Sequence, residues 1–348
     1  MQTAVASVII FSMIIFVHEF GHYLLAKFNG ILVEEFSLGM GPKLFSRKWK
    51  ETVYSLRVFP LGGFCRMAGE VGNEGYTTAQ TYDPRRFDQK PVFARMSVVL
   101  AGPVMNFLLA ALIFVSVFTI LGLPQGYSNQ IGSVVAGGAA DRVGLKAGDK
   151  VISLEGQKIE TWEQLVNIIH NNPGKELDVT VDREQTTLGF KVTPLLDAES
   201  KVGMIGISPS QPLWKKIGLW GGIKAGLTQT YTFTALTLEG IVQLVSGHAS
   251  SDDIAGPVGI VRLIDESTRF GLVYLANLTA LISISLGLFN LLPIPALDGS
   301  RLLFMLIEAF RGRPVSPAKE NFVHLVGFVF LMLLMIFVTY QDILRVFG

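Results

Sequence analysis

The stretch FVHEFGHYLL, residues 16–25, places two histidines and a glutamate at the end of an otherwise apolar segment. On a helix, His18 and His22 are four positions apart and therefore face the same side. Two imidazoles at this spacing can bind one Zn²⁺, and the intervening Glu19 can take a proton from the water that the metal activates. Ionisable side chains inside an apolar span are rare and usually functional. The stretch therefore predicts a zinc site. The alternative is a histidine pair that only makes hydrogen bonds within a helix bundle.

A further ligand is needed, because a catalytic zinc usually has three protein ligands and one open position. The best candidate is Asp298, in FNLLPIPALDGSRLL, residues 289–303. Two prolines break the helix just before it, and an aspartate in such an apolar setting is costly unless it is paired or bound to metal. The alternative is a surface ion pair between Asp298 and Arg301, and His324 is a weaker candidate for the third ligand.

The composition indicates a chain that is partly membrane-embedded. Of its 348 residues, 50% are hydrophobic and only 16% are charged, which is too apolar for an ordinary soluble enzyme. The formal net charge of +1 gives no reason to expect a nucleic-acid partner. The single cysteine, Cys65, excludes an internal disulfide and a multi-cysteine metal site. The apolar N-terminus lacks a basic leader, so we expect a retained first span rather than a cleaved signal peptide.

Four apolar segments are long enough to cross a bilayer, which takes roughly 20 residues. We predict a multi-pass α-helical membrane protein with a membrane re-entrant β-hairpin and one inserted extracytoplasmic α/β domain. The predicted segments are membrane helices at 1–28, 96–123, 271–309 and 321–342, cytoplasmic loops at 29–95 and 310–320, the α/β domain at 127–210 and an amphipathic, interfacial linker at 211–270.

The distribution of basic residues predicts the orientation. Of the 29 Lys and Arg residues, eleven lie between Lys27 and Arg95, and four more flank the loop between spans three and four. Both connections should therefore be cytoplasmic, whereas the two termini and the inserted domain should be extracytoplasmic. His18 is nine residues before Lys27, or about 13 Å of helix, which puts the zinc site within the membrane near its cytoplasmic side.

The first loop contains a segment with strand-like composition. The stretch TVYSLRVFPLGGFCRMAGE, residues 52–70, has β-branched and aromatic residues interrupted by one proline and two glycines. It predicts a β-hairpin at about 53–68. The hairpin is apolar enough to enter the membrane where protein or water satisfies its backbone groups. The alternative is an ordinary cytoplasmic hairpin.

Taken together, HEFGH in the first span, NLLPIPALDG (residues 290–299) in the third and the inserted domain resemble the bacterial site-2 proteases. These are intramembrane zinc metalloproteases of peptidase family M50, and this chain looks like a member with a single PDZ domain. The resemblance implies one zinc per chain, held by His18, His22 and Asp298, with Glu19 as the general base. It also implies that Asn290 and Asn106 contact the substrate or the developing oxyanion, although either could instead serve helix packing.

The resemblance further assigns a peptide-presenting strand. The stretch 53–66 is similar to the family's re-entrant β-loop, which implies that Arg57, Val58, Phe59, Gly62 and Gly63 pair with the substrate as an added strand.

The run GSVVAGGAADRVGLKAGDKVISLEGQKI, residues 132–159, resembles a PDZ domain. That likeness implies a peptide groove at Met204, Ile205, Gly206 and Ile207. The domain could alternatively act as a steric cap that excludes bulky substrates.

The family also implies the biological setting. The expected substrates are single-span proteins of the bacterial cytoplasmic membrane, such as an anti-sigma factor already trimmed by an upstream site-1 protease, or signal-peptide remnants. Two other functions compete with this one. A membrane metal-ion transporter is disfavoured because the chain has only four predicted spans and no internal repeat. A PDZ-bearing membrane scaffold would leave both buried motifs unexplained.

Overall fold

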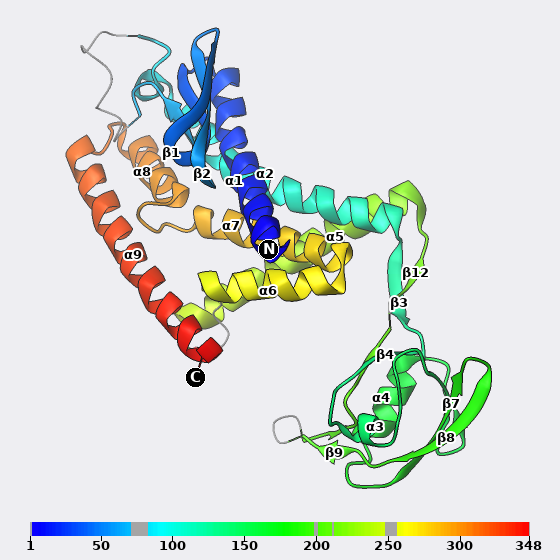
Figure 1. Ribbon diagram of the computed structural model, residues 1–348. Coiled ribbons are helices and arrows are strands. Elements are labelled where there is room, and N and C mark those ends of the chain that lie inside the picture. Colours follow the sequence, from blue (N-terminus) through cyan, green and yellow to red (C-terminus); the bar gives the residue numbers. More distant parts are fainter. Residues whose placement is uncertain (1, 71–82, 198–200, 211, 248–255, 348) are drawn as a thin grey trace. The chain divides into compact units, whose positions relative to one another are not determined.

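The computed structural model describes residues 2–70, 83–197, 201–210, 212–247 and 256–347 (Figure 1). The helices are α1 (Gln2–Phe28), α2 (Val92–Ile120), α3 (Ala139–Arg142), α4 (Trp162–His170), α5 (Gly218–Val245), α6 (Pro257–Phe270), α7 (Leu272–Leu291), α8 (Asp298–Arg311) and α9 (Pro317–Phe347), with a 3-10 turn at Phe87–Gln89. The strands are β1 (Val33–Trp49), β2 (Thr52–Met67), β3 (Leu123–Tyr127), β4 (Ile131–Val134), β5 (Lys150–Leu154), β6 (Gln157–Lys158), β7 (Leu177–Arg183), β8 (Thr186–Val192), β9 (Leu195–Leu196), β10 (Gly203–Met204), β11 (Ile207–Pro209) and β12 (Pro212–Lys215).

The chain forms two compact units, residues 1–117 with 222–348 and residues 118–221. Within the described residues, four helices are long and apolar enough to cross a membrane: Gln2–Phe28, Val92–Ile120, Leu272–Leu291 and Pro317–Leu344. The segment 271–309, predicted as one helix, is instead two helices, because α7 ends at Leu291 and α8 starts at Asp298. Prolines at 293 and 295 prevent the helix from continuing through the break.

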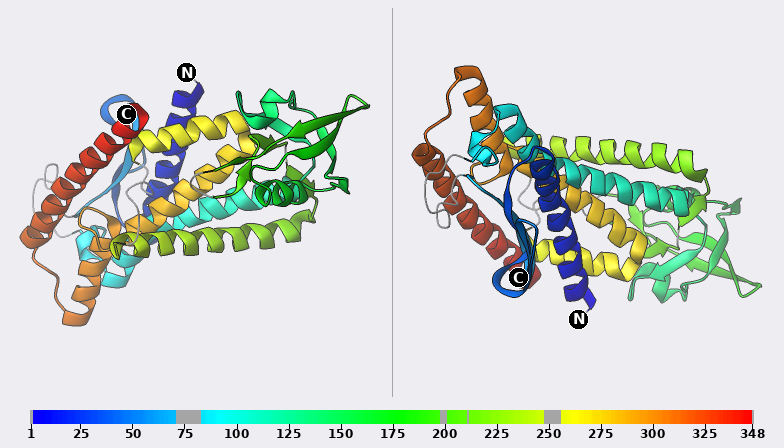
Figure 2. Two further views of the ribbon diagram at one scale, coloured as in Figure 1. Left: turned by 90° about the horizontal axis from the view of Figure 1, so that it is seen from below. Right: turned by 90° about the horizontal axis from the view of Figure 1, so that it is seen from above.

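Small residues let the helices of the first unit approach closely. A Cβ added at Gly21 of α1 would lie 2.4 Å from the backbone oxygen of Ala101 in α2. The predicted linker 211–270 contains α5 and α6, and its residues 211 and 248–255 lie outside the described part of the chain. Helix α5 runs alongside α2 (Figure 2), with Phe233 stacked on Phe114 at a centroid distance of 5.6 Å.

Strands β1 and β2 form a sheet that packs along α1 (Figure 1). The prediction of a hairpin within 53–68 is wrong in its pairing. Residues 35–38 of β1 lie between two parts of β2, since Glu35 opposes both Val53 and Arg66. The outer part of β1 then pairs with the start of β2, as in the pair Trp49 and Thr52. The strand order is therefore 63–67, 33–38, 53–57 and 43–49, and both strands bend at glycines with positive φ, such as Gly39 (87°) and Gly62 (103°).

The second unit is a small α/β domain with its own core. A four-stranded sheet in the order β6–β5–β7–β8 packs against α4, and buried side chains such as Leu154, Leu165 and Val181 fill the space between them. Helix α4 begins with a capping box in which Thr161 accepts from the backbone N–H of Gln164. Strands β3 and β12 pair at the two ends of the unit's chain. Residues 198–200 of the predicted domain 127–210 lie outside the described residues.

Candidate metal centre

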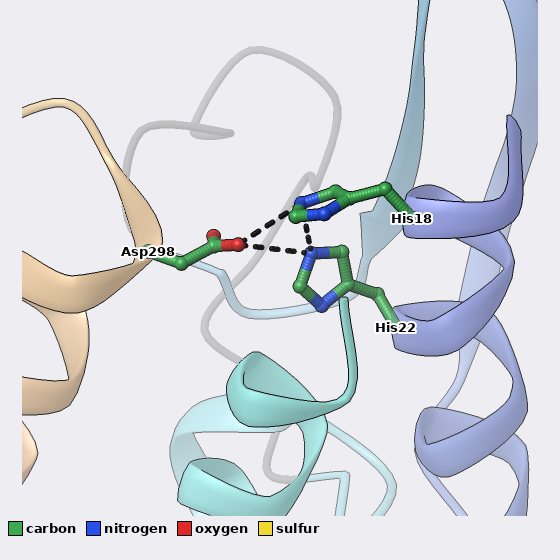
Figure 3. A group of neighbouring side chains, drawn as sticks. All are labelled: His18, His22 and Asp298. Carbon is green, nitrogen blue, oxygen red and sulfur yellow. Dashed lines mark hydrogen bonds and ion pairs between the residues drawn. The ribbon is translucent and has the colours of Figure 1, made fainter. Parts of the chain in front are cut away.

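His18 and His22 lie one helical turn apart on α1, and both residues are buried at 7% exposure. Their Nε2 atoms are 3.2 Å from each other. Figure 3 shows both rings turned toward the Asp298 carboxylate, which approaches from a different part of the chain. Asp298 Oδ2 is 3.1 Å from His18 Nε2 and 3.3 Å from His22 Nε2. The helical spacing of the histidines thus produces two donors on one side, and the third donor comes from α8.

The loop before α8 places Asp298 in this position. Helix α7 ends at Leu291, and the chain reaches Asp298 at the first position of α8 through a proline-rich turn in which Ala296 has a φ of 76°. The N–H of Ala296 donates to Nδ1 of His324 in α9, at 3.0 Å. A Cβ added at Gly299 would lie 2.1 Å from the backbone oxygen of Leu292, so this position requires glycine. The aspartate is therefore positioned by a strained turn that another helix supports.

Helix α2 supports the histidines from behind through residues spaced four apart. His22 Nδ1 donates to the backbone oxygen of Val98 at 2.9 Å, which leaves Nε2 free to bind a metal. A Cβ added at Gly102 would lie 2.4 Å from His22 Nε2 and 2.9 Å from His18 Cε1, so only glycine leaves room for both rings. The side-chain amide of Asn106 lies 3.2 Å from His18 Nδ1. These three residues hold the orientation of both imidazoles.

The three donors fit a zinc ion. Donors about 2.0–2.2 Å from a tetrahedral zinc lie roughly 3.3–3.6 Å apart, close to the 3.1–3.3 Å separations found here. They form the one group of at least three candidate ligands found in the described residues. Asp298 Oδ2 is buried and has no hydrogen-bond partner among the described residues. A buried carboxylate oxygen that lies within 3.3 Å of two imidazole nitrogens is what a metal ligand would show.

A cavity of about 640 Å³ opens onto these donors. Glu19 lines it beside His18, His22 and Asp298, and a Cβ added at Gly63 would lie 3.5 Å from Glu19 Cγ. The remaining lining residues come from β2, α2, α7, α8 and α9 and the turns beside them: Phe64, Cys65, Arg66, Met67, Glu70, Val99, Asn290, Ala296, Arg301, Asn321, His324, Leu325 and Phe328. A candidate general base thus shares one cavity with the candidate metal ligands.

The structure separates the residues expected to contact substrate into two groups. Asn290 lines the cavity, and its Nδ2 donates to the backbone oxygen of Leu286 at 3.0 Å. Asn106 does not line it, because its side chain has no exposed surface and lies behind His18. Asn106 is thus placed to orient a metal ligand, rather than to touch a substrate.

The predicted substrate strand lies on β2, mostly outside the part that lines the cavity. Arg57, Val58, Phe59 and Gly62 are not among the residues that line the cavity, whereas Gly63 lies against Glu19. The segment that faces the cavity is 64–67. It pairs with residues 33–38 on one side, and no described strand pairs with its other edge. Hydrophobic and glycine patterns located this strand but not the part of it that reaches the site.

The sequence analysis did not predict the roles that three cavity residues have in the structure: Arg301, Glu70 and His324. Arg301 does not pair with Asp298 but forms a short ion pair with Glu70, so α8 is tied to the end of β2. Their separation of more than 200 positions along the chain left no local signal for this contact. His324, the weaker ligand candidate, instead supports the turn before α8.

In the second unit, Met204, Ile205 and Gly206 line a pocket of about 200 Å³ together with residues 195–197. Ile207, the fourth predicted groove residue, is not among the lining residues and pairs with Val134 of β4.

Comparisons with known proteins extend over nearly all of this chain. A family model described as peptidase family M50 matches residues 6–334. The zinc metalloprotease RasP of Geobacillus kaustophilus (strain HTA426) is 37% identical, and the match covers 100% of this chain and 99% of that protein. The regulator of sigma-W protease RasP of Bacillus subtilis (strain 168) is 36% identical, with 99% of each chain covered. The PDZ domain of an SdrC-like protein from Listeria monocytogenes covers 25% of this chain and 90% of its own, at 20% identity and a TM-score of 0.22.

Proposed function

We propose that this chain, which belongs to peptidase family M50 and is a membrane zinc metalloprotease of the site-2 type, hydrolyses peptide bonds in or near the membrane-spanning segment of single-span proteins. The observation that carries the proposal is the common cavity of His18, His22, Asp298 and Glu19. Membership of a protease family also decides against the transporter and the scaffold. Neither function would need a glutamate between two metal ligands.

The ligand set would be His18 Nε2, His22 Nε2 and Asp298 Oδ2, with one zinc per chain. When bound there, zinc supplies a Lewis acid that activates water and polarises the scissile carbonyl. The backbone oxygen of Val98 accepts from His22 Nδ1 and so holds the His22 tautomer that presents Nε2. The Asn106 amide lies 3.2 Å from His18 Nδ1 and would do the same for His18 with its carbonyl oxygen turned toward the ring. The turn held by His324 brings in the carboxylate.

Glu19 would act as the general base and then as the general acid. It would take a proton from the attacking water and return it to the amine that leaves when the C–N bond breaks. Its position on the cavity wall next to Gly63, within one helical turn of both histidines, supports this role. Asn290, whose side chain also lines the cavity, would contact the substrate carbonyl.

Residues 64–67 of β2, which line the cavity, would hold the substrate as an added strand. A helix hides its carbonyl groups in its own hydrogen bonds, whereas an extended strand exposes alternate carbonyls to attack. Contacts along α1 support the re-entrant placement of this sheet. Ser12 Oγ donates to the backbone oxygen of Pro60, and Lys27 pairs with Glu51 at 3.1 Å, so the sheet follows α1 over much of its length. The Arg301–Glu70 pair would keep the edge aligned with Asp298.

The setting would be the bacterial cytoplasmic membrane, with the active site toward the cytoplasm and both termini and the PDZ-type unit outside. One relative is named a regulator of sigma-W protease. By analogy, the substrates here would be an anti-sigma factor first trimmed by a site-1 protease, or signal-peptide remnants. The pocket at Met204, Ile205 and Gly206 would receive peptide ends outside the membrane.

The proposal is tested with the full chain in lipid vesicles together with a single-span model substrate. Wild type should contain one zinc per chain and cleave the substrate. Asp298→Asn should hold zinc more weakly and cleave at least a hundredfold more slowly, because a charged ligand is lost. Unchanged zinc content in Asp298→Asn would remove this residue from the ligand set. A wild type that binds zinc but cleaves no single-span substrate would contradict the proposed substrate class.

A further inference from the structure

The β1–β2 sheet has two chemically different faces, because successive side chains of a strand point to opposite sides. On one face, Glu35 accepts from Ser55 Oγ at 2.7 Å and from Arg57 Nη2 at 2.8 Å, and it pairs with Lys43 at 3.1 Å. The other face carries aromatic and aliphatic side chains such as Phe36, Tyr54 and Leu56, and the Phe36 ring is T-shaped to that of Phe16 in α1 at 5.7 Å. One face thus satisfies its own charges, and the other is apolar.

A groove of about 610 Å³ lies between the apolar face and α1. It is lined by Phe16, Phe36, Leu38, Phe45, Arg47, Trp49, Tyr54, Ser55 and Leu56. Its rings form a continuous wall, with centroid distances of 6.4 Å between Phe36 and Tyr54 and 6.2 Å between Tyr54 and Trp49. The groove is separate from the zinc cavity, since the two share no lining residue.

If α1 crosses the membrane as proposed, the groove extends along the membrane normal for about the thickness of one leaflet. Lys27, in the last turn of α1, pairs with Glu51 in the turn that follows Trp49, so this end lies at the cytoplasmic end of the span. Phe16 is eleven residues further into the helix, or about 16 Å. Half of a hydrocarbon core of roughly 30 Å is about 15 Å. The aromatic wall therefore extends from the membrane surface to its middle.

The shallow end of the groove carries two cationic side chains, Arg47 and Lys50, for which no ion pair to a described residue is found. Arg47 lies on the apolar face between Phe45 and Trp49 and opposite Tyr54. Its side chain is exposed, and no hydrogen bond or ion pair to a described residue is found for it. Lys50 lies over the Trp49 ring, 5.4 Å from its centroid. No Asp or Glu occurs between residues 36 and 50. A long cationic side chain on an apolar surface places its charge at the membrane interface.

We propose that this groove binds an anionic phospholipid of the cytoplasmic leaflet. Arg47 and Lys50 would contact the phosphate, and one acyl chain would lie along Phe16, Phe36 and Leu56. A guanidinium makes paired hydrogen bonds to phosphate oxygens, and basic residues near the surface attract anionic lipids. A membrane-spanning peptide would fill the apolar part but would bring no fixed negative charge to Arg47. The combination of depth and charge therefore favours a lipid.

The test uses the fluorescence of Trp49 in the full chain, taken as the difference between wild type and Trp49→Phe. The protein is reconstituted in phosphatidylcholine vesicles that contain a small fraction of phospholipid with brominated acyl chains, which quench nearby tryptophan. In wild type, brominated phosphatidylglycerol should reach half-maximal quenching at a mole fraction at least tenfold lower than brominated phosphatidylcholine. Arg47→Gln should abolish this preference. Arg313→Gln, which removes an exposed cation from the loop before α9, should leave it unchanged.

Three outcomes would overturn the proposal. Wild type could show equal quenching by both lipids, which would mean non-specific contact with bulk lipid. Arg313→Gln could act like Arg47→Gln, which would mean a general effect of net charge. A single-span peptide could displace the brominated lipid at equimolar amounts, which would make the groove a substrate site. Zinc content and cleavage measured in the same vesicles separate a failure of this lipid site from a failure of the protease assignment.

Discussion

Asn106 of α2 lies directly behind His18 of α1, with its side-chain amide 3.2 Å from imidazole Nδ1 and no surface exposed to solvent. If His18 presents Nε2 to zinc, its Nδ1 carries the proton and needs an acceptor. The Asn106 carbonyl oxygen, which otherwise has no partner among the described residues, supplies one when the amide turns over.

Asn106→Leu should therefore weaken zinc binding by about 10–100-fold, the usual effect of losing such a support. Asn106→Asp, which keeps an acceptor, should retain much more of the affinity. Competition between the purified full chain and a zinc chelator measures both. If the two variants lost the same affinity, Asn106 would act by packing alone.

Gly102 provides the space into which both imidazoles fit. Gly102→Ala would bring a Cβ within 2.4 Å of His22 Nε2, so we expect the variant to fold but to lose zinc and cleavage together. Gly240→Ala is a matched control in α5, because nothing lies within 4 Å of the added Cβ and alanine favours a helix. Metal analysis and circular dichroism distinguish site loss from unfolding. Full zinc content in Gly102→Ala would mean that the rings do not occupy this space.

A variant of His324 tests whether this residue supports the turn before Asp298 or binds the metal. In His324→Ala the N–H of Ala296 loses its acceptor, which at this exposed position costs about 0.5–1.5 kcal/mol and loosens the turn before Asp298. We expect one zinc per chain at saturating zinc, a faster rate of zinc release and slower cleavage. His170→Ala, a histidine of α4 in the other unit, serves as the control. Complete loss of zinc from His324→Ala would instead identify His324 as a ligand.

Asp149 makes the stability of the second unit dependent on pH. Burial alone would raise the pKa of Asp149, but hydrogen bonds from Arg183 at 2.6 Å and from the backbone N–H of Lys146 at 2.8 Å outweigh it, and the net pKa is lowered. Its contribution is therefore complete above the unfolded pKa of about 3.9 and is lost as pH falls through the lower folded pKa.

Asp149→Asn should destabilise this unit by about 2 kcal/mol at pH 7 and reduce its loss of stability in acid. Hydrogen exchange of the β5 and β7 amides, compared between pH 7 and pH 2, measures both effects. Asp178 has an exposed side chain on β7, so Asp178→Asn should change neither the stability at pH 7 nor its loss in acid. Equal protection in the two variants at pH 7 would show that the Asp149–Arg183 pair contributes nothing.

Local sequence signals led to the residues that we propose as metal ligands. The positions of His18, Glu19 and His22 follow from helical spacing alone, and the apolar setting of Asp298 marked it as unusual. The resemblance to the site-2 proteases is confirmed by the family match over residues 6–334. The supports of the site were harder to find, because Val98 acts through a backbone oxygen and its helix gives no sign of that contact.

The β1–β2 sheet shows where sequence reasoning fails. Residues 33–49 contain two acidic residues, three basic residues and a proline, so they lack the alternation that predicts a strand. Their pairing with both halves of β2 is long-range and depends on bends at glycines such as Gly39. The sequence therefore predicts strands only at 53–68 and pairs the two halves of β2 with each other. Of the predicted substrate strand Arg57, Val58, Phe59, Gly62 and Gly63, none is among the residues that line the cavity, whereas residues 64–67 are.

The most direct test of the account replaces the proposed base while leaving the ligands intact. Wild type, Glu19→Gln and His22→Ala are purified in detergent, and each is measured for zinc content and for cleavage of a single-span reporter. We expect one zinc per chain in wild type and in Glu19→Gln, with cleavage reduced at least a thousandfold in Glu19→Gln, and loss of both zinc and cleavage in His22→Ala. Cleavage by Glu19→Gln at the wild-type rate, with zinc bound, would contradict the central claim that Glu19 is the general base.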